Sequence, residues 1–191
     1  MRVSKEQAAE NRARILTEAA RLFRERGLSG VGVDALTEAA GLTHGSLYSQ
    51  FGSKERLAAE ALEAAMAGTA LARIPDDAGP EALAGIVANY LSPAHRDRPG
   101  KGCAFAALGC DVARQGPALR EVFTGGIRMA AKRLAMLLPG RRRQASEDRA
   151  LALLSAMVGA LILARAVDDP ALSDRILAAT RTALTAEGIE A

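Results

Sequence analysis

A short run of polar side chains between residues 43 and 54 has the types and spacing needed to bind a nucleic acid. Imidazole, hydroxyl and amide groups can hydrogen-bond to base edges in the major groove of DNA. The run offers four such side chains: His44, Ser46, Ser49 and Gln50. Gln50 is suited to a bidentate contact with adenine. These four residues are therefore the candidates for reading base edges.

The other residues of this run suit contacts with the phosphate backbone. Thr43 is a good N-cap and can place its hydroxyl near a phosphate while it closes its own helix. Gly45 has no side chain, so the helix that carries it can lie close to the DNA. Tyr48 offers a hydroxyl to a phosphate, unless it is a half-buried packing residue. Lys54, at the start of the next helix, adds its charge to a positive helix terminus.

Other kinds of chemistry have little support in the sequence. A nucleophile–base pair would need Cys103 with His44 or His95, and no spacing or flanking motif favours that pair. His44 has no second ligand at metal-binding spacing. We therefore expect a protein that is not an enzyme and that has no metal and no cofactor.

Short helices must position the polar run. An amphipathic helix is predicted from Ser4 to Arg26, with Gly27 as its C-terminal stop. A glycine-rich connection then leads to a short helix from Val33 to Ala40, which ends at Gly41. A second short helix starts after Thr43 and runs to about Gln50. Two short helices joined by a tight turn that contains glycine form a helix-turn-helix pattern.

The long first helix is the support on which the two short helices must pack, because helices of seven or eight residues are not stable alone. Leu47 and Phe51 are expected in the core of this unit. The polar face of the long helix carries Lys5, Arg12 and Arg14, which are either further contacts to the DNA backbone or a solvated face.

The segment from Gly30 to Glu55, GVGVDALTEAAGLTHGSLYSQFGSKE, resembles the TetR family of transcriptional regulators. The matching positions are Val33, Leu36, Ala40-Gly41-Leu42, Thr43, Gly45, Leu47-Tyr48, Phe51 and Ser53-Lys54-Glu55. The motif covers about residues 10 to 60. The family often has a serine or threonine just before the first helix of the motif, where it caps and touches phosphate. This chain has Val31 and Gly32 there, and glycine offers no hydroxyl for that contact.

The composition predicts an all-α protein, because 49% of the residues are apolar, mainly alanine and leucine, and only 3% are aromatic. A long helix from Ser53 to about Ala72 is followed by a linker from Ile74 to Pro80. Further helices are expected at Glu81–Leu91, Cys103–Arg114, Pro117–Leu138, Ser146–Val167 and Pro170–Ala186. The total is about nine helices, in a three-helix DNA-binding domain (residues 1–53) and a helical ligand-sensing and dimerisation domain (residues 54–191).

Charge and hydropathy indicate a cytoplasmic protein. The net charge of +3 is only mildly basic and does not identify a nucleic-acid binder by itself. The N-terminus lacks the apolar region of a secretory signal. The apolar stretch from Ala150 to Ala164 is shorter than the roughly 20 residues of a membrane span, which favours a buried core helix. Two cysteines do not suggest a disulfide scaffold.

The resemblance implies a homodimer that places each short helix in the major groove of a palindromic operator in double-stranded DNA. The predicted helix Ser146–Val167 is apolar on nearly every face and rich in small residues. We expect it to form a four-helix interface with the last helix across a two-fold axis. The expected interface residues are Leu153, Ala156, Met157, Ala160, Leu161 and Ala164. The alternative is a central helix in a monomeric bundle.

The resemblance also implies a small-molecule inducer, held in a mostly apolar cavity of the C-terminal domain, which releases a repressor from DNA. An activator is the alternative within the class, and a helical protein-interaction module without specific DNA binding is the alternative outside it. The candidate cavity residues, each of which could be plain core, are Tyr90, Cys103, Phe105, Leu108, Phe123, Met129 and Met136.

Cys103 supports a different hypothesis about the signal. It follows Lys101-Gly102 at the start of a predicted helix, and a helix N-terminus and a nearby lysine both lower the pKa of a thiol. Cys103 is therefore a candidate sensor of oxidants or electrophiles, with two inert buried cysteines as the alternative. Cys110 lies two helical turns away, about 10.5 Å, which is beyond the reach of a disulfide within an intact helix.

Overall fold

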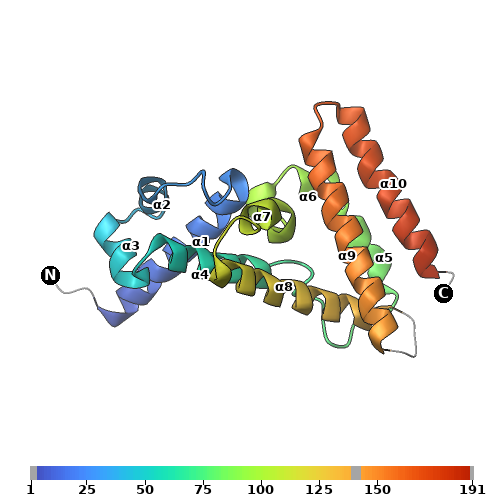
Figure 1. Ribbon diagram of the computed structural model, residues 1–191, viewed down its shortest axis with the longest axis horizontal. Coiled ribbons are helices and arrows are strands. Elements are labelled where there is room, and N and C mark those ends of the chain that lie inside the picture. The colour runs from blue at the N-terminus through green and yellow to red at the C-terminus, as the bar shows by residue number, and fades with distance from the viewer. Residues whose placement is uncertain (1–3, 139–142, 190–191) are drawn as a thin grey trace.

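The computed structural model describes residues 4–138 and 143–189, and the side chains of residues 4–138 and 144–185. The described part of the chain is helical without strands, which confirms the predicted fold class (Figure 1). It contains ten α-helices and one 3₁₀ helix, where the sequence predicted about nine helices. The four-residue helix α6 (Pro93–Arg96) is the additional one, and it is too short to produce a hydrophobic period.

The first three helices form a compact N-terminal unit, at the blue and cyan end of Figure 1. They are α1 (Lys5–Arg26), α2 (Val33–Ala39) and α3 (His44–Phe51). Gly41 adopts a φ of +62° in the turn between α2 and α3, a conformation that favours glycine. The core between the helices is fully buried and consists of Ile15, Ala19, Phe23, Leu36, Leu47 and Phe51.

Helix α4 (Lys54–Ala67) joins this unit to the rest of the chain and packs against both α1 and α8. Ser53 caps it by accepting the backbone N–H of Arg56 at 3.1 Å. The prediction that this helix extends to Ala72 was wrong. The chain turns at Gly68 instead, where the Thr69 side chain accepts the backbone N–H of Ala72 at 3.2 Å and caps a new turn.

The remaining elements build the C-terminal part of the molecule. Helices α8 and α9 pack together, and α9 also pairs with α10, which lies at the outer edge in Figure 1. Asp169 starts α10 by accepting the backbone N–H groups of Ala171 and Leu172 at 2.8 and 3.1 Å. The element bounds are α5 (Ala82–Tyr90), η1 (Pro99–Lys101), α7 (Ala104–Val112), α8 (Pro117–Met136), α9 (Arg143–Ala166) and α10 (Pro170–Ile189).

Helix α9 is longer than its apolar stretch predicted. The segment Gln144–Ala166 is long and apolar enough to cross a membrane by length and composition alone. In this structure, however, α9 packs against α7, α8 and α10 in the manner of a core helix.

The predicted dimer-interface residues of α9 lie mostly on its inward face. Ala156 is half-buried, and the other five are buried inside their own chain, which leaves little of their surface for a second copy: Leu153, Met157, Ala160, Leu161 and Ala164. The outward face of α9 instead carries Leu151 and Leu163, which are 41% and 57% exposed. A helix that is apolar all round gives no sequence signal for which of its faces meets its own core.

Candidate nucleic-acid interface and adjoining cavity

Helix α3 has one face in the core and the remaining surface open. Leu47 and Phe51 are buried, whereas Ser46 and Gln50 are half-buried. The exposed residues at its start and along its open face are Thr43, His44, Gly45, Tyr48 and Ser49. Tyr48 is 49% exposed, which is unusual for a large aromatic side chain and leaves it available for contact with a partner.

Local hydrogen bonds fix the start of α3. Thr43 Oγ1 accepts the backbone N–H of Ser46 at 3.4 Å, as expected of the N-cap. The same oxygen lies 3.3 Å from Ser46 Oγ, and Ser49 Oγ donates to the carbonyl of Ser46 at 3.0 Å. These bonds hold the hydroxyl groups of the candidate surface in defined positions.

Asp34, at the start of α2, is a residue that the sequence interpretation missed. Its carboxylate forms an ion pair with His44 Nε2, and both side chains are largely exposed. The carboxylate orients the imidazole and also reduces the local positive charge. The only sequence signal was an acidic residue in the first turn of α2.

The candidate cations of α1 differ in their surroundings. Lys5 and Arg14 are exposed, and Arg14 donates to the side chain of Asn11 at 2.8 Å. Arg12 instead forms an ion pair with Glu60 of α4, and its guanidinium lies 4.7 Å from the centre of the Phe51 ring. Arg12 therefore fastens α1 to α3 and α4, so its charge is less available to a phosphate.

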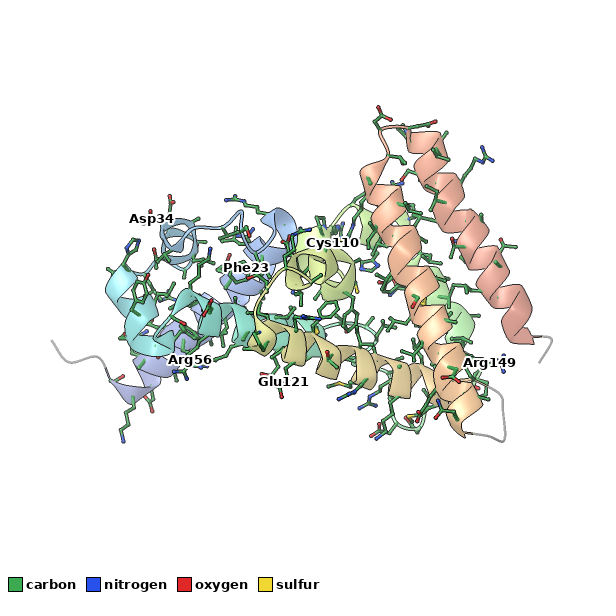
Figure 2. The ribbon with its side chains drawn as sticks, viewed as in Figure 1. Phe23, Asp34, Arg56, Cys110, Glu121 and Arg149 are labelled. Atoms are coloured by element: carbon green, nitrogen blue, oxygen red, sulfur yellow. The ribbon has the colours of Figure 1, made fainter. Side chains whose placement is uncertain are left out.

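Helix α4 presents two cations in its first turn. Lys54 is half-buried at the first position of α4, next to the end of α3. Arg56 is exposed two residues later, and the sequence interpretation did not single it out although its proximity to Lys54 was a signal. In Figure 2, Asp34 and Arg56 lie on either side of the N-terminal unit, with Phe23 in its interior.

A cavity of about 260 Å³ lies where the turn after α4 meets α5, α6, η1 and the start of α7. Apolar groups form the larger part of its wall, and polar groups contribute the rest. The side chains that line it include Thr69, Leu71, Asn89, Tyr90, Ser92, His95, Arg98, Lys101 and Cys103.

Of the predicted cavity residues, only Tyr90 and Cys103 line this space. Phe105 and Leu108 are buried between helices, and Phe105 packs edge-to-face on Phe123 with ring centres 5.5 Å apart. Met129 and Met136 are 48% and 42% exposed on the outer face of α8, so they do not line the cavity. A hydrophobic side chain in a helix does not by itself reveal whether it meets a core, a cavity or solvent.

His95 is held between two backbone groups of the cavity wall. Its Nε2 accepts the backbone N–H of Cys103 at 3.0 Å, and its Nδ1 lies 2.7 Å from the carbonyl oxygen of Tyr90. Because Nε2 accepts, the ring is neutral and its single proton is on Nδ1, which donates to that carbonyl. Burial lowers the pKa of His95, and the charge of Arg165 adds to this effect.

Cys103 is buried, at 2% exposure, and burial raises the pKa of its thiol. The expectation that the helix start and Lys101 lower this pKa was therefore wrong, because desolvation of the thiolate dominates. His95 contacts the backbone N–H of Cys103 and not its sulfur, so the two do not form a nucleophile–base pair. Cys110 is exposed on α7.

The hydroxyl of Tyr90 is buried and has no hydrogen-bond partner among the described residues. Burial and the nearby Cys103 thiol raise the pKa of Tyr90. An unpartnered buried hydroxyl costs free energy, and such groups in native proteins commonly have a role or an unseen partner.

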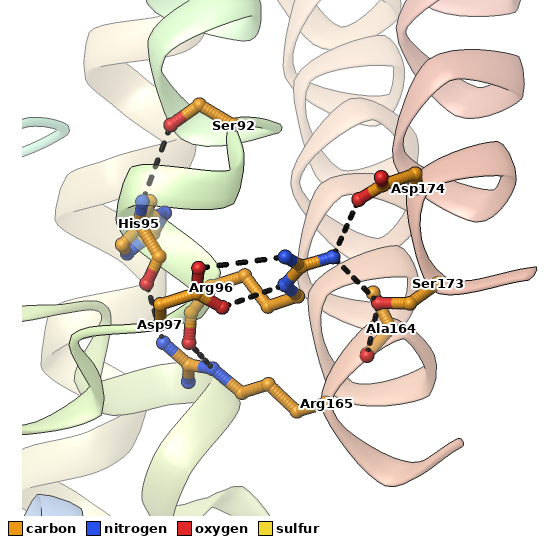
Figure 3. A network of polar contacts seen from close by, with 8 residues as sticks. All are labelled: Ser92, His95, Arg96, Asp97, Ala164, Arg165, Ser173 and Asp174. Carbon is orange, nitrogen blue, oxygen red and sulfur yellow. Dashed lines mark hydrogen bonds and ion pairs between the residues drawn. The ribbon is translucent and has the colours of Figure 1, made fainter. Parts of the chain in front are cut away.

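A polar network anchors α6 to the last two helices (Figure 3). Arg165 of α9 donates to the carbonyl oxygens of His95 and Arg96 at 2.9 and 3.0 Å. Arg96 donates to Ser173 at 2.8 Å and to Asp174 at 2.7 Å, both on α10. The wall of the cavity that contains His95 is thus attached to α9 and α10.

Two elements beside the cavity, η1 and α7, are also bonded to the N-terminal unit. Arg24 of α1 donates through Nε to the carbonyl oxygen of Gly100 in η1 at 2.8 Å. The backbone N–H of Leu28 donates to Asp111 Oδ2 at 2.8 Å, near the end of α7. Both η1 and α7 are therefore hydrogen-bonded to the N-terminal unit, η1 to α1 and α7 to the loop before α2.

Comparison with known proteins extends these observations. Residues 15–61 match the family model of the bacterial regulatory proteins, tetR family. No curated protein matches the chain. The matched segment contains α2, α3 and the flanking parts of α1 and α4.

Solved structures with a similar fold cover nearly the whole chain. The reduced form of Escherichia coli NemR superposes with a TM-score of 0.76 at 20% identity, over 92% of this chain and 95% of that one. A TetR-family transcriptional regulator from Cytophaga hutchinsonii gives 0.75 at 23% identity, over 97% and 98%. A TetR regulator from Chloroflexus aurantiacus gives 0.74 at 22% identity, over 94% and 96%.

At these identities the solved structures show a shared fold, and the family model describes residues 15–61 alone. The matched family consists of DNA-binding regulators and not of enzymes. The open polar face of α3 occupies the recognition-helix position of that helix-turn-helix. Residues 15–61 therefore match the tetR family of bacterial regulatory proteins, and the chain as a whole shares its fold with solved TetR-family regulators.

Proposed function

We propose that this protein is a homodimeric, cytoplasmic transcriptional repressor that a small molecule releases from a palindromic operator. The observation that carries this proposal is the open face of α3, which presents Tyr48 and short polar side chains from a helix-turn-helix of the matched family. In such motifs the second helix enters the major groove and its N-terminal residues contact base edges.

The proposed DNA contacts divide by chemistry. The hydroxyl groups of Thr43 and Tyr48 and the ammonium of Lys54 contact phosphates, and Gly45 permits close approach. Base edges are read by His44, Ser46, Ser49 and Gln50. Lys5, Arg14 and Arg56 are exposed cations that add backbone contacts, with Arg12 as a more weakly placed contributor because Glu60 neutralises it.

The proposed dimer forms through the outward faces of α9 and α10 in the domain of residues 54–191, with residues 1–53 as the DNA-binding domain. Leu151 and Leu163 of α9 and Leu172 of α10 are large apolar side chains that the isolated chain leaves exposed. Nothing lies within 4 Å of a Cβ placed on Gly159, so a second helix has room to approach there. Such a dimer would hold its two α3 helices about 34–36 Å apart, or a multiple of that distance.

The proposed small-molecule site is the cavity lined by Tyr90 and Cys103. A thiol sensor centred on Cys103 is the second candidate, favoured by the position of this residue in the cavity wall and by the likeness to a reduced form of NemR. The burial of Cys103 opposes it, because the thiolate is the reactive form and burial raises the pKa of the thiol.

Selection of binding sites from random duplex DNA by the reduced, purified protein tests the proposal. An enriched inverted repeat, bound with an affinity that falls steeply as salt rises, is expected of a dimer that neutralises several phosphates. No enriched sequence at low salt would contradict the proposal and favour a protein-interaction module. An enriched single half-site would contradict the dimer alone.

A further inference from the structure

We propose that the cavity beside Tyr90 binds a small organic monocarboxylate with an apolar body, and that its carboxylate is held by Arg98 and Lys101. This inference rests on the proposed regulation by a small molecule and names the class of that molecule.

The charge of the cavity wall is the first observation. Arg98 and Lys101 line the cavity, both are exposed, and neither forms an ion pair with a described residue. No aspartate or glutamate is among the lining residues. Two uncompensated cations beside one cavity attract an anion, and carboxylates are the common organic anions that arginine and lysine bind.

A third cation lies behind the wall. Arg165 is held by the carbonyl oxygens of His95 and Arg96, and Asp97 offsets its charge in part without forming an ion pair with it. Its guanidinium lies next to the cavity wall, since a Cβ placed on the lining residue Gly102 would be 3.0 Å from Arg165 Nη2. The electrostatic field inside the cavity therefore favours a ligand without positive charge.

Tyr90 is the second, independent observation. Its side chain lines the cavity and its hydroxyl is a buried donor that no described residue accepts. The hydroxyl oxygen is covered by its neighbours, so one of them must shift before a ligand oxygen reaches it; that contact would then supply the hydrogen bond that the protein alone leaves unmade. His95 cannot accept a hydrogen bond from this hydroxyl, because its two ring nitrogens are already paired with backbone groups.

The size and the apolar part of the wall limit the ligand. A volume of about 260 Å³ lies just below the range of about 300–1,000 Å³ that drug-sized ligands occupy. Leu71, Ala70, Ala94 and the ring of Tyr90 provide the apolar contacts. The body of the ligand is therefore a single ring or a short alkyl chain and not a nucleotide or a peptide.

Thermal unfolding of the intact protein with matched acids and amides tests the ligand class. The probes are benzoate and hexanoate, each compared with its neutral amide, together with inorganic phosphate. A ligand that binds the folded protein raises its Tm in proportion to ln(1 + [L]/Kd). We expect a rise with at least one of the two carboxylates, and none with the amides or phosphate at equal concentration.

Variants locate the site. Arg98→Ala and Lys101→Ala should each weaken carboxylate binding about tenfold or more, the usual loss for a hydrogen bond to a charged group. Tyr90→Phe should weaken it severalfold without changing the preference for acid over amide. Lys132→Ala removes an exposed lysine of α8 outside the cavity and should bind as the unchanged protein does.

The outcomes separate this inference from the proposed function. Equal binding of acid and amide, equal binding of phosphate, full binding by the Arg98→Ala and Lys101→Ala variants, or no binding by any probe would each overturn the carboxylate site. DNA-site selection on the same preparation reports on the regulator independently. Carboxylate binding together with an unchanged affinity for the selected DNA would support the site and contradict its role as the switch.

Discussion

The backbone N–H of Leu28 donates to Asp111 Oδ2 at 2.8 Å, so the end of α7 is bonded to the loop that leads into the helix-turn-helix. The contact is close enough that a Cβ on Gly27 would lie 2.6 Å from the same oxygen. Gly27 also has a φ of +76°, so two independent constraints require glycine there. Because α7 begins at the cavity, we expect this bond to couple a ligand bound there to the DNA-contact surface.

Replacement of Asp111 tests this route. Asp111→Ala leaves the N–H of the buried residue Leu28 without its charged acceptor, and we expect a loss of about 1–3 kcal/mol in the free energy of unfolding. Urea denaturation measures it, with Asp77→Ala, at an exposed position in the linker after α4, as the control. A ligand that releases the unchanged protein from DNA should release the variant less effectively. Identical stability and release would contradict the route.

The pH dependence of stability follows from His95. Burial lowers its pKa in the folded protein below the ordinary value of 6.5, so the unfolded chain binds the proton more tightly. The stability contributed by the neutral ring is present above pH 6.5 and is lost as the pH falls through the folded pKa. Protonation would also remove the acceptor for the Cys103 N–H.

Denaturation curves between about pH 7 and pH 5 measure this effect. The unchanged protein should lose stability on acidification more steeply than His95→Gln, which cannot take up the proton. Equal slopes for the two proteins would show that His95 titrates as it does in the unfolded chain.

The reactivity of the two cysteines decides between the modes of regulation. Cys110 is exposed and Cys103 is 2% exposed with a raised thiol pKa. Iodoacetamide at pH 7 should therefore label Cys110 and leave Cys103 nearly unlabelled until the protein is denatured. Mass spectrometry of the digested protein measures both sites. Labelling of Cys103 faster than a free cysteine peptide would instead support the thiol sensor.

Two variants distinguish backbone contacts from base contacts. Lys54→Ala should weaken binding to all DNA sequences about equally and reduce the salt slope by about one. Gln50→Ala should change the preferred base at one position of each half-site. The free-energy difference between the preferred base and the other bases at that position should fall by about 1–3 kcal/mol. Binding-site selection and salt titration measure both effects, and Lys132→Ala provides a matched loss of one exposed lysine. An unchanged preferred site for Gln50→Ala would contradict its assignment.

The dimer is tested by a charge on the outward face of α9. Leu163 is 57% exposed, so Leu163→Glu should leave the fold of the single chain intact. In the proposed dimer the carboxylate would be buried without a partner at a cost of about 3 kcal/mol, which weakens association about a hundredfold. Sedimentation measures the dissociation constant. Met129→Glu alters a similarly exposed apolar residue of α8 and should remain dimeric. A dimeric Leu163→Glu protein would place the interface elsewhere.

The sequence was sufficient for the helix-turn-helix because the information there is local. Thr43 was predicted as a helix cap and makes the corresponding hydrogen bond, and Leu47 and Phe51 are buried as predicted. Gly41 has the positive φ that ends a short helix at glycine. Each of these features depends on a few neighbouring residues and not on the rest of the fold.

The cavity was not predictable, because it is assembled from irregular segments. Its polar residues His95, Arg98 and Lys101 belong to α6, η1 and the loop between them, which are too short for a hydrophobic period. Cys103 was assigned a lowered thiol pKa from its neighbours in sequence, whereas its burial depends on the packing of distant helices. The outward face of α9 could likewise not be predicted, because apolar residues occupy nearly all faces of this helix.

The division of α3 into two buried and six open or half-open positions also bears on how this protein can evolve. Surface substitutions usually change stability by less than about 0.5 kcal/mol, whereas loss of Leu47 or Phe51 would cost several times more. The residues proposed to read DNA are thus almost free of folding constraints. After duplication of its gene, a copy could acquire a different operator through one or two substitutions while the fold and the ligand cavity stay as they are.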